Sequence, residues 1–155
     1  MKEVTISTYR KDKYYPRVVQ AVARILIRSD VVAPVEVLLE MGNLSKKNHD
    51  AWLAGHVPYL ERVFEGSLSK ANRILRIIGF HAHDLSMIPM QVKYRQTGSR
   101  TSRELTFSKS GVKRVEEAYS RHYKWNQSQE KKSKAIEDAV SEPCAPADSV
   151  KTPRR

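Results

Sequence analysis

The chain repeats a short motif at a spacing of 24 residues. Residues 42–48 read GNLSKKN, and residues 66–72 read GSLSKAN. The match extends over residues 39–55 and 63–79, where 6 of 17 aligned positions are identical, so it involves more than the turn itself. Glycine favours the left-handed conformation that ends a helix, and serine accepts the free N–H groups that begin one. Each copy therefore predicts helix, tight turn and helix, a unit found in DNA-binding proteins and in plain helical bundles.

The net charge is strongly positive and unevenly distributed. The 155 residues include 28 Lys and Arg against 17 Asp and Glu, which gives +11. Residues 66–125 carry 12 basic and 4 acidic side chains, a net charge of +8, whereas residues 1–65 carry +2. Such a localised excess is typical of proteins with a polyanionic partner. We therefore expect nucleic acid as the partner, with double-stranded DNA first, ahead of an anionic membrane surface or an acidic protein.

Cysteine usage and hydropathy predict a cytoplasmic protein that does not enter a membrane. The single cysteine, Cys144, excludes a disulfide within one chain and a cysteine-based metal cluster. The first residues lack the apolar stretch of a secretory signal, and the apolar runs are too short to span a bilayer.

The chain divides into three predicted parts. Residues 1–15 are polar and charged, which predicts an N-terminal arm, and residues 16–125 form the predicted domain. Residues 126–155 are rich in Lys, Ser, Glu, Pro and Ala, which predicts a largely disordered tail with at most a short helix over 130–140. Tyr9, Tyr14 and Tyr15 in and beside the arm suit either a contact with a nucleic-acid backbone or a lid on the first helix.

Periodicity predicts a mainly α domain with a small β-hairpin. Apolar residues three and four apart, with proline or serine at the starts and glycine at several ends, predict helices. These helices cover residues 17–29, 34–41, 45–55, 58–65, 70–80 and 112–125. Alternating patterns over 90–94 and 104–107, joined by a polar and basic loop, predict the hairpin.

One predicted helix, 70–80, has an apolar stripe on one side and cations at a spacing of three on another. Such a helix fits the major groove of DNA, where arginine reads guanine, asparagine reads adenine and lysine binds phosphate. The candidate nucleic-acid-binding residues are Lys70, Asn72, Arg73 and Arg76 on this helix and Arg95, Arg100 and Arg103 on the hairpin.

This order of elements resembles winged helix-turn-helix DNA-binding domains over about residues 58–123. Residues 68–75, LSKANRIL, look like the start of a recognition helix, and residues 105–111, LTFSKSG, look like the end of a wing. The resemblance implies a winged helix-turn-helix-like domain that inserts helix 70–80 into the major groove, with residues 95–103 as the wing. It also implies a sequence-reading regulator of transcription and a homodimer through the C-terminal helix, for which Tyr119, Tyr123 and Trp125 are either seam or core.

Other partners and activities are compatible with the same residues. A basic face also suits an RNA-binding or ribonucleoprotein subunit, or a helical adaptor for an acidic protein. The first copy of the repeat has mixed charge after its turn, so we expect it to pack, with Lys46 and Lys47 as a lesser DNA contact.

Catalytic motifs are not found in the sequence. There is no glycine-rich phosphate loop, no HExxH and no GxSxG, so we expect no enzyme and no cofactor. A metal-dependent nuclease is the enzymatic alternative. The segment His81-Ala82-His83-Asp84 offers suitable ligand types but too few of them, and we expect no metal site there.

Overall fold

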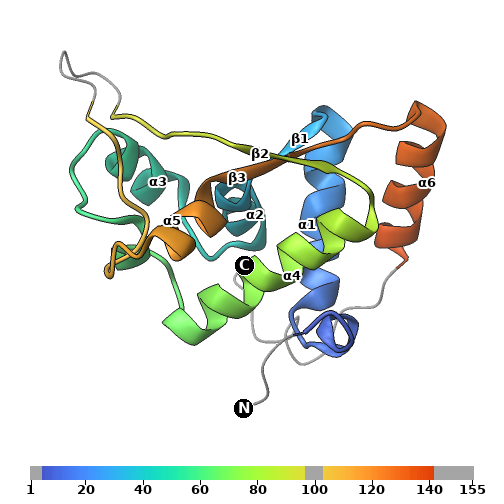
Figure 1. Ribbon diagram of the computed structural model, residues 1–155, viewed down its shortest axis with the longest axis horizontal. Coiled ribbons are helices and arrows are strands. Elements are labelled where there is room, and N and C mark those ends of the chain that lie inside the picture. Colours follow the sequence, from blue (N-terminus) through green and yellow to red (C-terminus); the bar gives the residue numbers. More distant parts are fainter. Residues whose placement is uncertain (1–4, 97–102, 142–155) are drawn as a thin grey trace.

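The protein is mainly helical with a small antiparallel sheet, as the sequence predicts (Figure 1). The computed structural model describes residues 5–96 and 103–141. The helices are α1 (Tyr15–Arg28), α2 (Pro34–Met41), α3 (Lys46–Leu53), α4 (Leu68–Asp84), α5 (Lys113–Ser120) and α6 (Gln129–Val140), with 3-10 turns η1 (Tyr9–Lys11) and η2 (Leu60–Arg62). The strands are β1 (Val31–Val32), β2 (Ile88–Gln91) and β3 (Arg121–Lys124).

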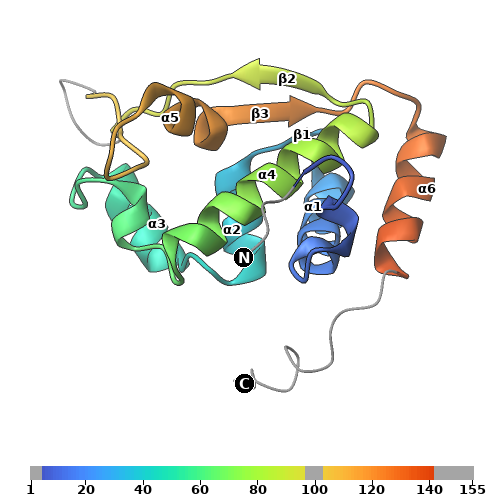
Figure 2. The same ribbon diagram turned by 60° about the horizontal axis from the view of Figure 1, so that its bottom comes forward.

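The sheet lies along one side of the helices α1, α2 and α4 (Figure 2). Helix α6 stands at one end of the molecule and α3 at the other in both ribbon views. The amphipathic helix α1 is the centre of the core. It buries Val18, Val22 and Ile25 on one face and contacts α2, α4 and α6. Burial of this stripe is what the 3-4 spacing of its apolar residues predicts.

The two copies of the repeat form different turns that bind each other. In the first copy, Gly42 adopts φ +84° and ends α2, and the Ser45 side chain accepts the Asn48 N–H at 3.1 Å to begin α3. Asn43 bridges to the second copy: its side-chain amide donates to the Glu65 carbonyl at 2.8 Å, and its carbonyl accepts the Glu65 N–H at 2.7 Å. The repeat therefore specifies two turns that meet.

The second copy does not lie between two α-helices, which corrects the predicted helix over 58–65. That segment contains the turn η2, and its Leu60 and Glu61 N–H groups donate to the carbonyls of Thr106 and Phe107. The next N–H groups, of Arg62, Val63 and Phe64, bond to carbonyls three residues back, which is the pattern of a 3-10 turn and not of an α-helix. Helix α4 begins two residues earlier than expected, because the cap is Ser67, and it runs to Asp84 instead of ending near residue 80.

The predicted hairpin is wrong in its pairing. The sheet has the order β1-β3-β2, so β2 pairs with β3, more than 25 residues further along the chain, and not with residues 104–107. Among the described residues, the expected partners keep one bridge between Arg95 and Glu104, with Leu105 N–H bonded to the Tyr94 carbonyl at 2.8 Å. We call residues 94–96 and 103–105 the hairpin base.

The folded part continues beyond residue 125, where the sequence predicts a largely disordered tail with at most a short helix over 130–140, and α6 is that helix. Helix α6 packs against α1, and its Lys132 ammonium lies 2.6 Å from Asp30 Oδ1. The expected last helix ends at Ser120, and the chain continues as the central strand β3. Tyr119, Tyr123 and Trp125 are buried in the core of the chain itself, so they do not offer a dimer seam.

Candidate nucleic-acid interface

The basic side of α4 is divided between two environments. Lys70 and Arg73 face the N-terminal segment: Lys70 Nζ lies 5.3 Å from the centroid of the Tyr14 ring, and Arg73 forms an ion pair with Asp12. The Asp12 side chain is only 2 % exposed. Tyr9 is buried against Phe80, with ring centroids 5.3 Å apart. The N-terminal segment therefore packs on α4 through Tyr9, Asp12 and Tyr14, and these two cations help to hold it there.

Replacement of Arg73 by alanine should lower the free energy of unfolding by about 2 kcal/mol, because it leaves the buried Asp12 carboxylate without its cation. Urea denaturation at pH 7 measures the change. The exposed neighbour Asn72 provides the control, since Asn72→Ala should change stability by less than about 0.5 kcal/mol. In a double-mutant cycle, the Asp12→Ala/Arg73→Ala protein should lose less than the sum of the single losses. Equal stability of Arg73→Ala and wild type would contradict the structural role.

Asn72 and Arg76 remain on the exposed side of α4. They are four residues apart and therefore share a face. The Arg76 guanidinium lies 5.9 Å from the centroid of the Phe80 ring and beside an open groove. These two residues keep the orientation that the sequence predicts for contact with a ligand.

The hairpin cations lie beside α3 and not beside α4. Arg95 and Arg103 are exposed at the hairpin base, and Arg100 lies outside the described residues. The Gln96 side chain donates to the Ala54 carbonyl at 3.2 Å, and the Trp52 indole N–H donates to the Thr106 carbonyl at 2.9 Å. These bonds hold the hairpin base at the end of α3. The fold therefore does not place the hairpin beside the helix 70–80, where the sequence predicts it.

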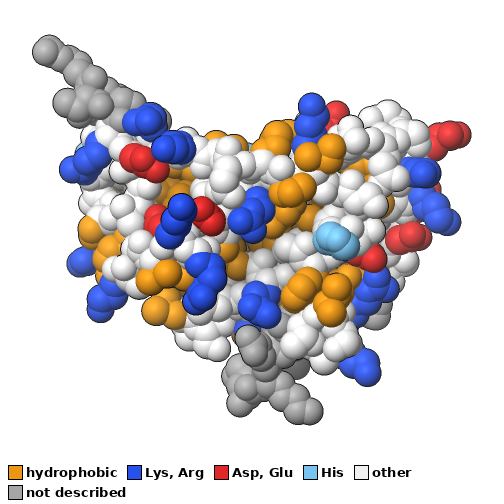
Figure 3. Space-filling model, viewed as in Figure 1, with side chains coloured by type: hydrophobic (Ala, Val, Ile, Leu, Met, Phe, Trp, Pro, Cys, Tyr) orange, Lys and Arg blue, Asp and Glu red, His pale blue; other side chains and the backbone are white. Residues whose placement is uncertain are grey.

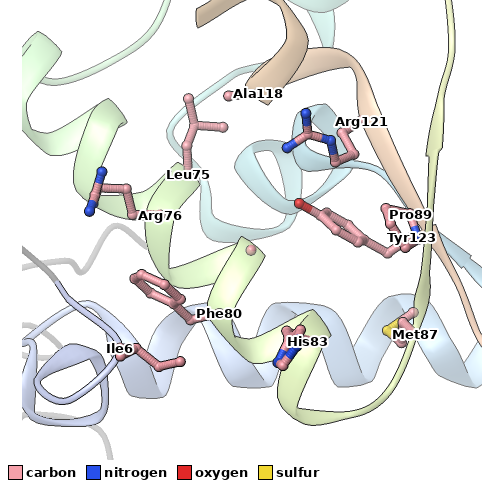
Figure 4. A pocket seen from close by; sticks show the side chains of 11 residues that line it. Ile6, Leu75, Arg76, Phe80, His83, Met87, Pro89, Ala118, Arg121 and Tyr123 are labelled. Carbon is pink, nitrogen blue, oxygen red and sulfur yellow. The ribbon is translucent and has the colours of Figure 1, made fainter. Parts of the chain in front are cut away.

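Two depressions bring together four cations, of which the sequence singled out only Arg76 as a candidate. A groove of about 630 Å³ between α4, α5 and the sheet is bordered by Arg76 and Arg121 (Figure 4). A cleft of about 300 Å³ between the chain after β2 and α5 is lined by Lys93 and Lys113, and also by the carboxylates of Glu104, Glu116 and Glu117. Gln91 joins them, since it lines the cleft and accepts a hydrogen bond from Arg121 Nε at 3.2 Å. We call Arg76, Arg121, Lys93 and Lys113 the basic band.

Acidic side chains lie among the cations of the basic band, and several of them are bound within the protein. The Glu116 carboxylate accepts the N–H groups of Phe107 and Ser108 at 2.9 and 2.7 Å and the Ser108 hydroxyl at 2.6 Å. Glu117 lies 4.0 Å from Lys113 and offsets the charge of this member of the basic band, and Asp84 forms an ion pair with Arg10 at 2.8 Å. Figure 3 shows Lys and Arg side chains spread over this face with apolar side chains gathered between them. The same view shows Asp and Glu side chains beside some of these cations, so the face carries cations, carboxylates and apolar side chains together.

Tyr123 forms a wall of the groove between α4 and the sheet. Burial raises the pKa of its phenol, so the group stays protonated and neutral at pH 7. Its hydroxyl points toward α4 at Gly79, where an added Cβ would lie 3.5 Å from the oxygen (Figure 4). The groove thus owes its open floor to the absence of a side chain at Gly79.

The segment of His81, His83 and Asp84 forms the end of α4. His81 is buried and His83 is exposed, so the two imidazoles do not converge. Within residues 5–96 and 103–141, no group of three or more His, Cys, Asp or Glu side chains is placed to hold a metal ion. None of the helices in that part of the chain is both long and apolar enough to cross a bilayer.

Comparison with known proteins found no family model, no curated protein and no solved structure that matches this chain. The resemblance of the sequence to winged helix-turn-helix domains therefore stays a prediction.

Sequence reasoning missed Arg121, Lys93 and Lys113 for a physical reason. Arg121 was assigned to a helix and lies on β3, where its side chain reaches Gln91 on the neighbouring strand. Lys93 and Lys113 are far apart in sequence and meet only because the chain after β2 runs beside α5. The charge of +8 over residues 66–125 was the signal for such a surface, but it did not identify its members.

Proposed function

We propose that this protein binds nucleic acid, with double-stranded DNA as the favoured form, through the basic band. The observation that carries the proposal is the convergence of four cations from α4, β3, the chain after β2 and α5 on two adjoining depressions, of which the groove beside Arg76 has no Asp or Glu among its described lining residues. Lysine and arginine on one face bind phosphates without regard to sequence, and they make affinity depend on salt. Arg95 and Arg103 at the hairpin base extend the cationic surface toward α3.

In this proposal, helix α4 recognises the base sequence of the DNA. Arg76 suits a bidentate contact with guanine and Asn72 a bidentate contact with adenine, and both are exposed on one face of the helix. Lys70 and Arg73 contribute to the field of the surface while they hold the N-terminal segment. A role in regulating transcription would follow from sequence-specific binding of this kind.

Removal of two band charges should weaken DNA binding and its salt dependence together. We expect Lys93→Ala/Lys113→Ala to lose at least about tenfold in affinity for a mixed-sequence duplex, and to reduce the slope of log K against log salt by about 2. Fluorescence anisotropy between low and physiological salt measures both quantities. The matched control is Lys131→Ala/Lys134→Ala on exposed positions of α6, which removes the same charge and should cost less than about threefold.

Three outcomes decide the proposal. Failure of the wild-type protein to bind duplex DNA at low salt would refute it. Equal losses from the band pair and the α6 pair would show that only net charge matters. Tighter binding of structured RNA than of duplex DNA in direct competition would replace DNA by RNA as the ligand.

A further inference from the structure

The groove beside Arg76 has features that phosphate binding alone does not require. Its walls and floor are mostly apolar, with Leu75, Phe80, Met87, Ala118 and Tyr123 among the lining side chains. Phosphate contacts need donors and cations and gain nothing from an apolar cavity. A volume of about 630 Å³ lies within the range of pockets that take small organic groups, roughly 300–1,000 Å³.

The charges at the groove select an anionic occupant. Figure 4 shows Arg76 and Arg121 on opposite sides of Leu75, one from α4 and the other from β3. Among the described residues that line the groove, none is Asp or Glu. An occupant with an apolar planar body and a phosphate at each end would complement both the floor and the two guanidinium groups.

We infer that the groove receives one unstacked nucleotide, with its base on the apolar floor and its flanking phosphates beside Arg76 and Arg121. Bases that leave a stack bind to aromatic rings and to guanidinium planes, and Phe80, Tyr123 and the two arginines provide both. The protonated Tyr123 hydroxyl adds a hydrogen-bond donor at the floor. This inference rests on the proposed function for the binding of nucleic acid. It gives Arg76 a phosphate contact in place of the contact with guanine, and it narrows the ligand to nucleic acid with an unpaired nucleotide.

The floor of the groove suggests a way to test the inference by filling the space. Gly79 lies in the helical part of α4, and a Cβ there would make ordinary contact with the Tyr123 hydroxyl. A leucine at this position extends into the groove, while an alanine adds one methyl group. Ala118 borders the groove from α5, so Ala118→Leu fills it from the opposite side and guards against a folding defect in a single variant.

The experiment compares a DNA duplex that carries one unpaired 2-aminopurine with the same duplex fully paired. We expect wild type to bind the first at least about tenfold more tightly and to change the fluorescence of the unpaired base, since stacking on protein rings alters its emission. Gly79→Leu and Ala118→Leu should each reduce this preference to within about twofold of unity, and Gly79→Ala should retain it. Circular dichroism and thermal melting check that each variant is folded.

A second set of measurements uses a free nucleotide, to distinguish binding of a nucleotide within a DNA strand from binding of a mononucleotide. Adenosine monophosphate is titrated as a competitor against the unpaired duplex and as a ligand alone. Equal affinity for both duplexes without a fluorescence change overturns the inference and leaves the proposed DNA binding intact. If neither duplex binds but the free nucleotide does, and Gly79→Leu abolishes this, the groove is a site for free nucleotides, and the proposed function and the part of the inference that rests on it are refuted. If nothing binds, both are refuted.

Discussion

Replacement of Trp52 by alanine should lower the free energy of unfolding by about 3–5 kcal/mol, the range observed for fully buried large aromatic residues. Trp52 is 0 % exposed, and it lies where α3 meets the hairpin base. Its ring centroid is 5.5 Å from that of Tyr94 and 5.1 Å from that of Phe107. The substitution removes the indole from this cluster and leaves a cavity that the surrounding rings cannot fill.

The hydrogen bond of the indole adds to the loss. Trp52 Nε1 donates to the Thr106 carbonyl at 2.9 Å, which joins α3 to a segment more than 50 residues away. Without the indole, that carbonyl loses a partner inside the protein, and a typical net contribution of such a bond is about 1 kcal/mol. The range of about 3–5 kcal/mol already includes the lost hydrogen bond, because measured large-to-small substitutions report the loss of packing and of hydrogen bonds together.

Urea denaturation of Trp52→Ala and Trp52→Phe distinguishes ring packing from the hydrogen bond. Phenylalanine keeps most of the aromatic contact but not the donor, so we expect it to lose clearly less stability than alanine. A loss below about 1.5 kcal/mol for Trp52→Ala would mean that the hairpin base is not packed on α3 as described. The positions of Arg95 and Arg103 in the proposed interface would then be in doubt as well.

The sequence predicts those parts of the fold whose signals are local. Helix α1 follows from its apolar stripe, and α2 and α3 follow from Pro34, Gly42 and Ser45, whose caps need only their immediate neighbours. The small amount of β structure was also expected. These elements form from contacts within a few residues, so periodicity and capping chemistry suffice to find them.

Pairing between distant strands is not encoded in this way. β1 has two residues, and the sequence of β3, RHYK, reads as the end of the preceding helix. Both become strands because Tyr123 pairs with Val32 on one side and with Pro89 on the other. The sheet is therefore fixed by pairings between segments that lie far apart in the sequence, and a pattern confined to one segment does not reveal them.

The same difference between local and long-range contacts explains which residues of the candidate site the sequence predicts and which it does not. Helical spacing correctly places Asn72 and Arg76 on an exposed face, but it cannot show that Asp12, 61 residues earlier, lies beside Arg73. The basic band likewise joins residues whose separation in sequence hides their proximity. Charge counted along the chain predicts that a cationic surface exists, and only the fold shows which side chains compose it.

Acidification should destabilise the protein well before its carboxylates titrate, and His81 should cause much of the effect. His81 is 7 % exposed at the end of α4, and its ring packs edge-on against Tyr15 at 6.1 Å. Its Nδ1 is buried and has no hydrogen-bond partner among the described residues. Burial lowers the pKa of His81 to about 4, with the nearby Asp84 opposing this shift and Arg10 adding to it.

The direction of the pH dependence follows from comparing the folded and unfolded chains. An unfolded histidine has a pKa of about 6.5, so above that pH both states are neutral and His81 adds no pH dependence. Between about pH 6.5 and 4 the unfolded chain binds a proton that the folded protein cannot, and the folded state loses stability as pH falls. A pKa difference of this size corresponds to about 2 kcal/mol lost by pH 5 and about 3 kcal/mol by pH 4.

Two further histidines contribute in the same direction. Burial lowers the pKa of His49 on α3, and it also lowers the pKa of His122 on β3. The wild-type protein should therefore lose somewhat more stability than His81 alone accounts for. Isolating the share of His81 requires a variant in which only that imidazole is removed.

We expect His81→Leu to be as stable as wild type at pH 7 or more so, because leucine fills the same apolar site without an unpartnered ring nitrogen. Its free energy of unfolding should fall by about 2 kcal/mol less than that of wild type between pH 7 and pH 5. Urea denaturation at several pH values measures both, and His56→Leu, at an exposed position, is the matched control. Parallel pH profiles for wild type and His81→Leu would show that His81 is not held neutral in the core.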